Sequence, residues 1–208
     1  MIVMKIAESS PKRKIGRPLS FDRDAALHQA MLLFWQHGYE ATSVSALTAA
    51  MGITAPSLYT AFGDKKNLFL EAVQHYSSGS AAAEQMIDEA ATARDAAWAL
   101  LHGAVISFTG DDTPAGCLLA SAAVSCSDEA SDVRDELAAI RQRIETRLRK
   151  KILRAIKNGE LPKQKDADAM SGHVMAVIQG MSTLARDGAS RDKLTRVITQ
   201  AMRSWDGA

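Results

Sequence analysis

The chain is poor in the residues that stabilise small secreted proteins. It has two cysteines, Cys117 and Cys126, in 208 residues, and 5% of its residues are aromatic. On one helix these two thiols would point in opposite directions, because nine steps of about 100° end half a turn away. A disulfide between them is therefore not expected, and a reducing cytoplasm is the predicted compartment.

A long hydrophobic run and a strong net charge are also missing. The longest nearly uncharged apolar run covers residues 96–108, which is too short for a membrane span of about 20 residues. Residues 1–10 lack the apolar core of a signal peptide. The formal net charge is +1, so any surface that attracts nucleic acid must be local. We expect a globular protein that does not enter a membrane.

Motifs of common catalytic chemistry are absent as well. The sequence contains no G-x-S-x-G, no H-E-x-x-H and no phosphate-binding glycine loop, and its five histidines are scattered. The cysteines and histidines show no metal-ligand spacing. These absences argue against an enzyme, and we expect no cofactor and no metal.

The most informative stretch runs from residue 42 to residue 66. Val44, Leu47 and Met51 recur at helical spacing, and Thr42 or Ser43 can cap the helix that they predict. Gly52 follows, where a helix often ends in a left-handed residue. The pattern predicts a helix of about two turns that stops at this glycine.

A second short helix is predicted directly after it. Thr54 can cap this helix, and Pro56 falls in its first turn, where a missing N–H costs nothing. Leu58 and Phe62 form one buried seam. The polar side chains off that seam then point outward, and they are Ser57, Tyr59 and Thr60. Two short helices joined by a glycine turn, with the second polar on its outer face, are typical of a helix-turn-helix.

The rest of the chain is predicted to be helical. A helix over residues 22–37 completes a three-helix DNA-binding domain over residues 20–66, and a longer helix begins at Lys65. Residues 67–208 read as a larger helical domain, with about nine helices in the whole all-α chain and no alternating β-branched run. The last two helices are apolar over more than a narrow stripe, which predicts burial both in the core and against a second subunit.

Two regions are rich in basic residues. Residues 1–19 carry a local charge of +4 and read as a flexible basic arm, and ahead of a helix-turn-helix such an arm can clamp phosphates or a minor groove. The helix over residues 131–157 is basic in its second half. A solvated face is favoured there over a second nucleic-acid surface.

Residues 16–76 resemble the DNA-binding domain of the TetR family of bacterial transcriptional regulators. The resemblance rests on G-R-P, L-F-W-Q-H-G-Y-E-A-T-S, M-G-I, P-S-L-Y and A-F-G-D-K-K. It implies a repressor that binds a palindromic double-stranded DNA operator as a homodimer, paired through the last two helices, and that a small molecule releases.

The resemblance also implies roles for individual residues. Base reading falls to Ala55, Pro56 and Ser57, and phosphate contact to Thr42, Tyr59 and Lys65. The predicted DNA-binding set is completed by Ser43, Thr54, Thr60 and Arg17. Alanine at positions 55 and 61 cannot make a bidentate hydrogen bond to a base, so readout is expected to rest on Ser57, apolar contacts, the arm and DNA shape.

An effector is expected to bind among the helices of residues 80–185. Aromatic, thiol and thioether side chains there give a candidate set, which is Trp98, His102, Phe108, Cys117 and Met175. The effector would favour a dimer whose reading heads are wrongly spaced for DNA, and the helix beginning at Lys65 would transmit the change.

Two alternatives stay open at this point. One is a thiol- or metal-sensing regulator of the same fold, acting through Cys117, Cys126, His102 and His173. The other is a helical dimer that acts through protein partners without binding DNA, which the alanines at 55 and 61 would allow.

Overall fold

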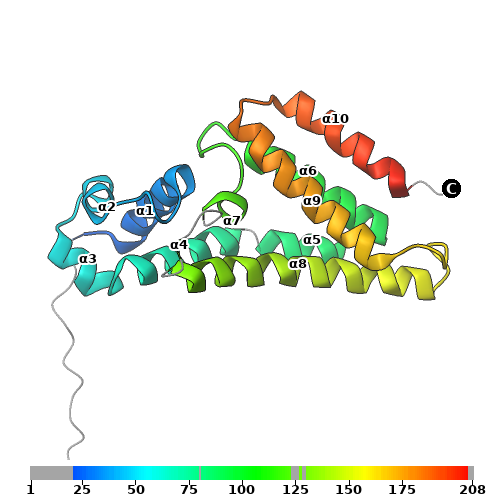
Figure 1. Ribbon diagram of the computed structural model, residues 1–208, viewed down its shortest axis with the longest axis horizontal. Helices are drawn as coiled ribbons and strands as arrows, with labels where there is room; N and C mark the ends of the chain where they lie inside the picture. The colour runs from blue at the N-terminus through cyan, green and yellow to red at the C-terminus, as the bar shows by residue number, and fades with distance from the viewer. Residues whose placement is uncertain (1–20, 80, 123–126, 128–129, 206–208) are drawn as a thin grey trace, which may run out of the picture.

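The computed structural model describes residues 21–79, 81–122, 127 and 130–205 (Figure 1). Within these ranges the protein consists of ten α-helices and a closing 3-10 turn, and no β-strand occurs. The helix beyond the nine expected is α7 (Leu118–Ser121), a single turn in the run of small apolar residues after Cys117. Arg17, the basic arm and Cys126 lie outside the described residues.

The first three helices form the predicted head. They are α1 (Arg23–His37), α2 (Val44–Met51) and α3 (Ala55–Phe62). Ser43 and Thr54 cap α2 and α3, and their hydroxyl oxygens accept hydrogen bonds from backbone N–H groups three residues ahead at 3.1 and 3.3 Å. Gly52 ends α2 in the left-handed region, with φ 66° and ψ 30°, which glycine adopts without a steric penalty. The caps and the turn of the helix-turn-helix are therefore confirmed.

Thr42 differs from the expectation. Only 2% of its surface is exposed, and its hydroxyl donates a 2.6 Å hydrogen bond to the carbonyl of Gly38. The bond closes the turn between α1 and α2, where the chain has left one helix and not yet begun the next. The Thr42 side chain therefore stabilises the interior of the head, and its hydroxyl is already bonded to the Gly38 carbonyl. The phosphate contact at residue 42 stays a prediction.

Helix α4 (Lys65–Gly79) continues from the head into the rest of the molecule. Asp64 caps it, accepting a 2.7 Å hydrogen bond from the N–H of Asn67. Leu68 and Phe69 of α4 are fully buried against α1, where the rings of Phe69 and Phe34 meet edge to face at 5.0 Å. The start of α4 therefore belongs to the core of the head.

The remaining helices form the larger body. They are α5 (Ala81–Glu89), α6 (Ala93–Phe108), α8 (Ser131–Lys157), α9 (Ala167–Arg186) and α10 (Arg191–Met202), with a 3-10 turn at Arg203–Trp205. Helix α8 runs along α4 and α5, while α6, α9 and α10 pack above them (Figure 1). Among the described helices, none combines the length and the apolar character of a membrane span.

We expect Thr42→Val to destabilise the protein. Valine keeps the shape of threonine but leaves the Gly38 carbonyl without its buried donor, so the free energy of unfolding should fall by about 1–2 kcal/mol. Thr42→Ser keeps the hydroxyl and should lose less. Urea denaturation at a fixed protein concentration measures both. A Thr42→Val protein with wild-type stability but weaker DNA binding would support the phosphate contact.

Candidate nucleic-acid interface and ligand cavity

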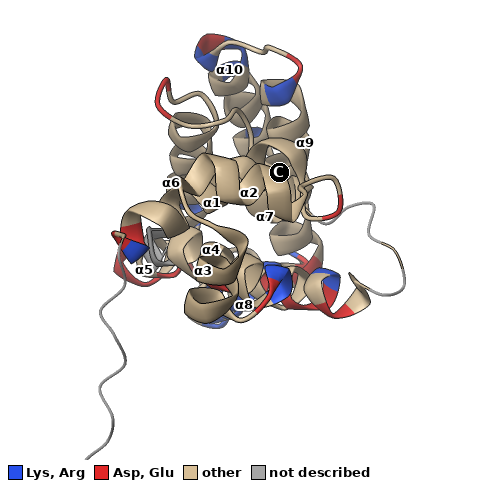
Figure 2. Ribbon diagram, turned by 90° about the vertical axis from the view of Figure 1, so that its left-hand side faces the viewer, with Lys and Arg blue, Asp and Glu red and all other residues tan. Residues whose placement is uncertain are grey.

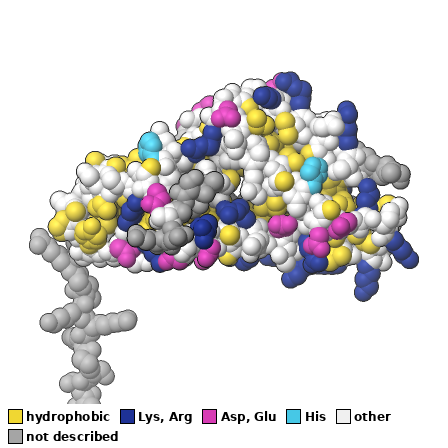
Figure 3. All heavy atoms as spheres, viewed as in Figure 1, with side chains coloured by type: hydrophobic (Ala, Val, Ile, Leu, Met, Phe, Trp, Pro, Cys, Tyr) yellow, Lys and Arg dark blue, Asp and Glu magenta, His cyan; other side chains and the backbone are white. Residues whose placement is uncertain are grey.

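The outer face of α3 is exposed at the tip of the head. Tyr59 shows 50% of its surface, Ala55, Pro56 and Thr60 are exposed, and Ser57 is half-buried. Hydrophobic side chains gather at this end of the molecule, on the left of Figure 3. Leu58 and Phe62 of the same helix are buried, so α3 presents one complete face to the outside. That face contains the residues predicted to read bases.

Hydroxyl groups form a small network on this face. The oxygens of Thr54 and Ser57 lie 2.9 Å apart, and the Thr60 hydroxyl donates to the Pro56 carbonyl at 2.8 Å. Ser57 keeps a rotatable hydroxyl next to solvent, which can donate to or accept from a base edge. Among the predicted residues, Tyr59 is the most extended polar group on the helix.

Formal charge is scarce around these helices. Helices α2 and α3 contain no charged residue, and they appear tan in the end-on view of Figure 2. The nearest cation is Arg23 of α1, which donates to the Ala61 carbonyl at 3.2 Å and forms an ion pair with Glu71. Lys65 and Lys66 follow at the start of α4. Backbone N–H groups at the N-termini of α3 and α4 add positive partial charge, so hydroxyls and helix dipoles outnumber ionic groups at the tip.

Lys65 is held by the head itself. Its ammonium nitrogen lies 4.6 Å from the centre of the Tyr39 ring and 3.4 Å from the Glu40 carbonyl oxygen. Lys66 forms an ion pair with Asp132 at the start of α8. Lys65 is therefore the cation that α4 positions beside α3, whereas Lys66 joins the head to the body.

A cavity of about 540 Å³ lies in the body. Phe108, Cys117 and Met175 line it, as predicted. Trp98 and His102 do not line this cavity: they stack on each other at 5.9 Å on the exposed face of α6, and Trp98 is 38% exposed. A ligand contact by these two residues stays a prediction. Residues 98 and 102 lie four apart at the exposed edge of α6, while the buried side carries Ala97, Leu101 and Phe108.

The thiol of Cys117 is buried in the cavity wall. The Tyr76 hydroxyl donates to its sulfur at 3.4 Å, and the Ser182 hydroxyl accepts from its backbone N–H at 2.9 Å. Burial raises the pKa of the Cys117 thiol above its ordinary value, and burial likewise raises the pKa of Tyr76. Both groups are therefore neutral near pH 7. In the part of the chain that the structure describes, no three His, Cys, Asp or Glu residues are grouped as metal ligands.

Sequence reasoning missed three polar residues of the cavity wall. Trp35 comes from α1, Tyr76 from α4 and Arg141 from α8. The sequence pattern of each helix predicts another role for the residue. It predicts core packing for the aromatic rings of Trp35 and Tyr76, and a solvated basic face for Arg141. Only the packing of α1, α4 and α8 around one space brings them together.

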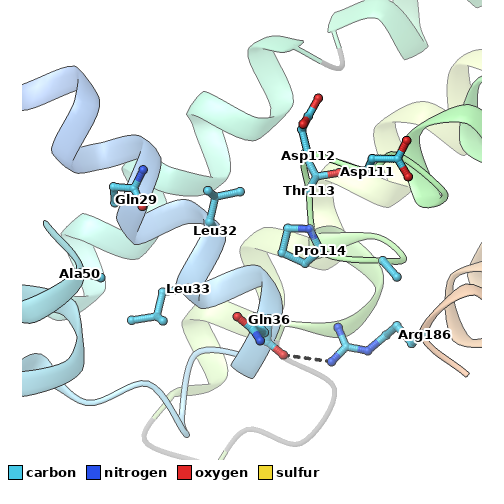
Figure 4. Close-up of a pocket in the computed structure, with 11 residues that line it drawn as sticks. Gln29, Leu32, Leu33, Gln36, Ala50, Asp111, Asp112, Thr113, Pro114 and Arg186 are labelled. Carbon is cyan, nitrogen blue, oxygen red and sulfur yellow. Dashed lines mark hydrogen bonds between the residues drawn. The ribbon is translucent and has the colours of Figure 1, made fainter. Parts of the chain in front are cut away.

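The head and the body also meet at an open groove of about 600 Å³ (Figure 4). Leu32 and Gln36 of α1 line one side, and loop residues 111–115 line the other. Arg186 at the end of α9 donates to the carbonyl oxygens of Trp35 and Gln36 at 3.2 and 3.1 Å. This arginine therefore ties the body to the last turn of α1.

A second set of contacts lies at the start of α2. The Tyr39 N–H donates to the Ala122 carbonyl at 2.8 Å, and the Glu40 carboxylate accepts from the Ser127 hydroxyl at 2.8 Å and from its N–H at 3.2 Å. The hydrogen bonds from Ser127 lower the pKa of Glu40. The segment after Cys117 thus contacts the cavity on one side and the head on the other.

Comparison with known proteins agrees with this anatomy. Residues 26–72 match the model of bacterial regulatory proteins of the tetR family, and residues 93–202 match the tetracyclin repressor-like C-terminal domain. The chain is 37% identical to the HTH-type transcriptional repressor ComR of Escherichia coli K12 over 93% of both chains.

Two solved structures extend the likeness to three dimensions. A cysteine-substituted TetR family regulator, CifR, complexed with a 26-bp operator DNA is 40% identical, with a TM-score of 0.86 over 91% of this chain and 100% of that one. A TetR regulator of Rhodococcus sp. RHA1 is 34% identical, with a TM-score of 0.58 over 88% of this chain and 98% of that one. The chain belongs to the TetR family of bacterial transcriptional regulators.

Proposed function

We propose that this protein is a transcriptional repressor that binds an operator as a homodimer and that a small molecule releases. The observation that carries the proposal is the exposed face of α3 together with a cavity close to the head. Helices α1 and α4 pack in the head and also contribute residues to the wall of this cavity. The similar proteins ComR and CifR are named as transcriptional regulators, and CifR binds operator DNA. Repression and operator binding extend from these relatives to this chain.

The mode of DNA binding follows from the surface of α3. The helix would enter the major groove with Ala55, Pro56 and Ser57 toward the base edges and with Tyr59 toward a phosphate. Ser43, Thr54 and Thr60 add hydroxyls or helix-terminal N–H groups beside the groove. Lys65 and the basic arm, including Arg17, would supply the ionic part of the affinity.

Dimerisation through α9 and α10 is supported by their outer faces. Ala176 and Gly180 of α9 are exposed, and Val177, Leu184 and Val197 are only half-buried. Small side chains permit close approach of a second pair of helices, and the larger apolar ones are then withdrawn from water. The domains would accordingly be an arm at 1–19, a DNA-binding head at 20–66 and a ligand-binding, dimerising body at 67–208.

Release by a ligand would use α4. Lys65 stands at its DNA end, and Tyr76, eleven residues later, lines the cavity. A ligand that fits the cavity better when α4 is displaced shifts the dimer toward a head spacing that does not match the operator. The contacts of Arg186 and Glu40 pass the same displacement to α1 and α2.

Thiol sensing is the second candidate, and the position of Cys117 in the cavity wall is what favours it. The raised pKa of its thiol works against reaction, because the thiolate is the nucleophile. If Cys117→Ser leaves the response to every cavity ligand intact, this candidate fails. The non-DNA-binding alternative fails if the protein specifically retards DNA.

We expect operator binding to weaken steeply as the salt concentration rises. Lys65 should contribute a measurable share of the slope of log K against log salt. Lys65→Gln should reduce the slope of log K against log salt by about 0.9 for the one phosphate contact removed. Gel-shift titrations of DNA from upstream of its own gene, at several salt concentrations, measure the slope. Lys163→Gln is the matched control, because residue 163 lies in the turn after α8, at the end far from the head (Figure 1). An unchanged slope for Lys65→Gln would remove this contact, and no specific retardation at any salt would reject DNA binding.

Tyr59→Phe should weaken binding to all DNA sequences about equally. The change removes one hydroxyl-to-phosphate hydrogen bond of about 1 kcal/mol, which is roughly a fivefold loss of affinity. Competition gel shifts with the operator and with an unrelated duplex test this. Tyr76→Phe removes a hydroxyl at the cavity instead and should stay within twofold of the wild type. A loss confined to the operator would assign Tyr59 to base reading.

Gly180→Arg should produce a folded monomer. A Cβ at Gly180 meets nothing within 4 Å, so the subunit accommodates the side chain, and arginine favours the helix by about 1 kcal/mol over glycine. In a dimer through α9 the two charges would be buried and unpaired. Sedimentation equilibrium should show monomers, and operator affinity should fall at least about tenfold because one head alone remains. Gln142→Arg on exposed α8 should stay dimeric, and a dimeric Gly180→Arg protein would place the interface elsewhere.

A further inference from the structure

The cavity wall carries a cation, Arg141, that has no anionic partner among the described residues. Arg141 lies in the half-buried part of α8, and one of its N–H groups donates to the Leu119 carbonyl. Among the described residues, no carboxylate lies within 4.0 Å of its guanidinium. One neutral carbonyl satisfies one of five donors. The other arginines of the same helix that face α5 and α9 are paired, Arg147 with Glu84 and Asp88, and Arg149 with Asp168.

A second donor of the wall is also unsatisfied. Trp35 is 3% exposed, and its indole N–H is buried without a hydrogen-bond acceptor among the described residues. A buried donor left unpaired costs about 1–3 kcal/mol. Trp35 belongs to α1 and Arg141 to α8, so two different helices bring these donors to the same cavity.

The remaining lining is largely apolar. It includes Leu100, Ala104 and Phe108 of α6 and Ile144 and Ile178 of the helices opposite. Asp111 and Asp112 carry the negative charges of the wall, and both are exposed in the loop after α6, where solvent and salt screen them. Burial lowers the pKa of Arg141 below its ordinary value, yet arginine stays charged in proteins. The interior is therefore an apolar space with one fixed positive charge.

We propose that the effector is an amphipathic acid, a mostly apolar molecule of small size whose anionic oxygen group pairs with Arg141 and whose oxygens give Trp35 an acceptor. The planar guanidinium matches carboxylate-like groups by two parallel hydrogen bonds. The volume of about 540 Å³ suits a drug-sized molecule, since ligand pockets span about 300–1,000 Å³. This inference deepens the proposed function, because it names the class of ligand for the same cavity.

The same contact explains how the ligand reaches the head. The indole of Trp35 lines the cavity, and the carbonyl of the same residue accepts from Arg186 of α9. A ligand held between Arg141 and Trp35 therefore acts on the last turn of α1 directly. Its ring neighbour Tyr76, edge to face at 5.0 Å, carries the change into α4.

Two fluorescent probes with the same ring system test the charge requirement. Anilinonaphthalene sulfonate carries an anionic group, and N-phenylnaphthylamine lacks it. With the full-length protein, Arg141→Met should weaken binding of the sulfonate at least about tenfold and change binding of the neutral probe less than about threefold. Arg143→Met, an exposed arginine of the same helix, should change neither. Equal effects of Arg141→Met on both probes, or none on either, would overturn the proposal.

Further variants keep the test decisive. If Arg141→Met does not fold, Arg141→Lys keeps the charge without the planar fork and should still weaken the sulfonate selectively. Ala104→Trp fills the cavity and should abolish binding of both probes, and sulfonate binding that survives it would place the probe elsewhere and count against the proposal. The indole proton signal of Trp35, assigned with Trp35→Phe, should shift in NMR spectra when the sulfonate is added to the wild type. An unmoved signal would remove Trp35 from the site.

The probe titrations need no DNA, so they separate this inference from the proposed function. A wild type that selects the sulfonate but binds no operator would reject the repressor and keep the site. A wild type that binds the operator but does not distinguish the two probes would reject the acid and keep the repressor.

Discussion

Helix α4 is buried against both halves of the molecule, and this constrains how they can move. Leu68, Phe69, Ala72 and Val73 are at most 1% exposed. The burial of Leu68, Phe69 and Val73 contributes about 1.5–3 kcal/mol for each side chain. The helix cannot slide along α1 without losing several of these contacts at once. It behaves as a rigid connection with a cation at one end and a cavity aromatic at the other. In the proposed mechanism, a small displacement at Tyr76 would therefore be passed to the head instead of being absorbed.

The head could be predicted from the sequence almost to the residue, because its signals are local. Ser43, Thr54 and Asp64 each cap a helix by accepting a hydrogen bond from the backbone N–H three residues ahead. Gly52 ends α2 because it can adopt a left-handed φ angle. Thr42 was the exception. Its hydrogen-bond partner is the Gly38 carbonyl at the end of the preceding helix. In the sequence, a threonine just before a helix gives the same signal whether its hydroxyl caps the helix, binds a phosphate or closes the turn.

The cavity could be predicted only as a region. Of the five candidate residues, Phe108, Cys117 and Met175 line the cavity, whereas Trp98 and His102 lie on the exposed face of α6. The apolar stripe of α6 is broad, so the sequence alone does not show which of its residues are buried. The packing of α5 and α9 against α6 determines which side of the stripe is withdrawn from solvent. Arg141 was read as part of a solvated basic face. On the same helix, Arg147 and Arg149 form ion pairs with carboxylates. Arg141 forms no ion pair with a described residue, and no sequence pattern predicts this difference.

Affinity and specificity for DNA are assigned to different parts of this chain. Helices α2 and α3 have no formal charge, so the reading face contributes hydroxyls, apolar surface and helix dipoles, all of which act over a few ångströms. In the proposed repressor, the long-range attraction would come from Lys65 and from the five basic residues of the arm. Their ionic contacts with phosphates would not depend on the DNA sequence. A head that binds weakly by itself would need the head of the partner subunit to bind the same operator. Two linked heads on one operator give a much higher affinity than either head alone. With that dependence, a change of spacing would be sufficient for release. The proposed ligand would not need to unfold or block α3, because it would move the second head out of register with its groove.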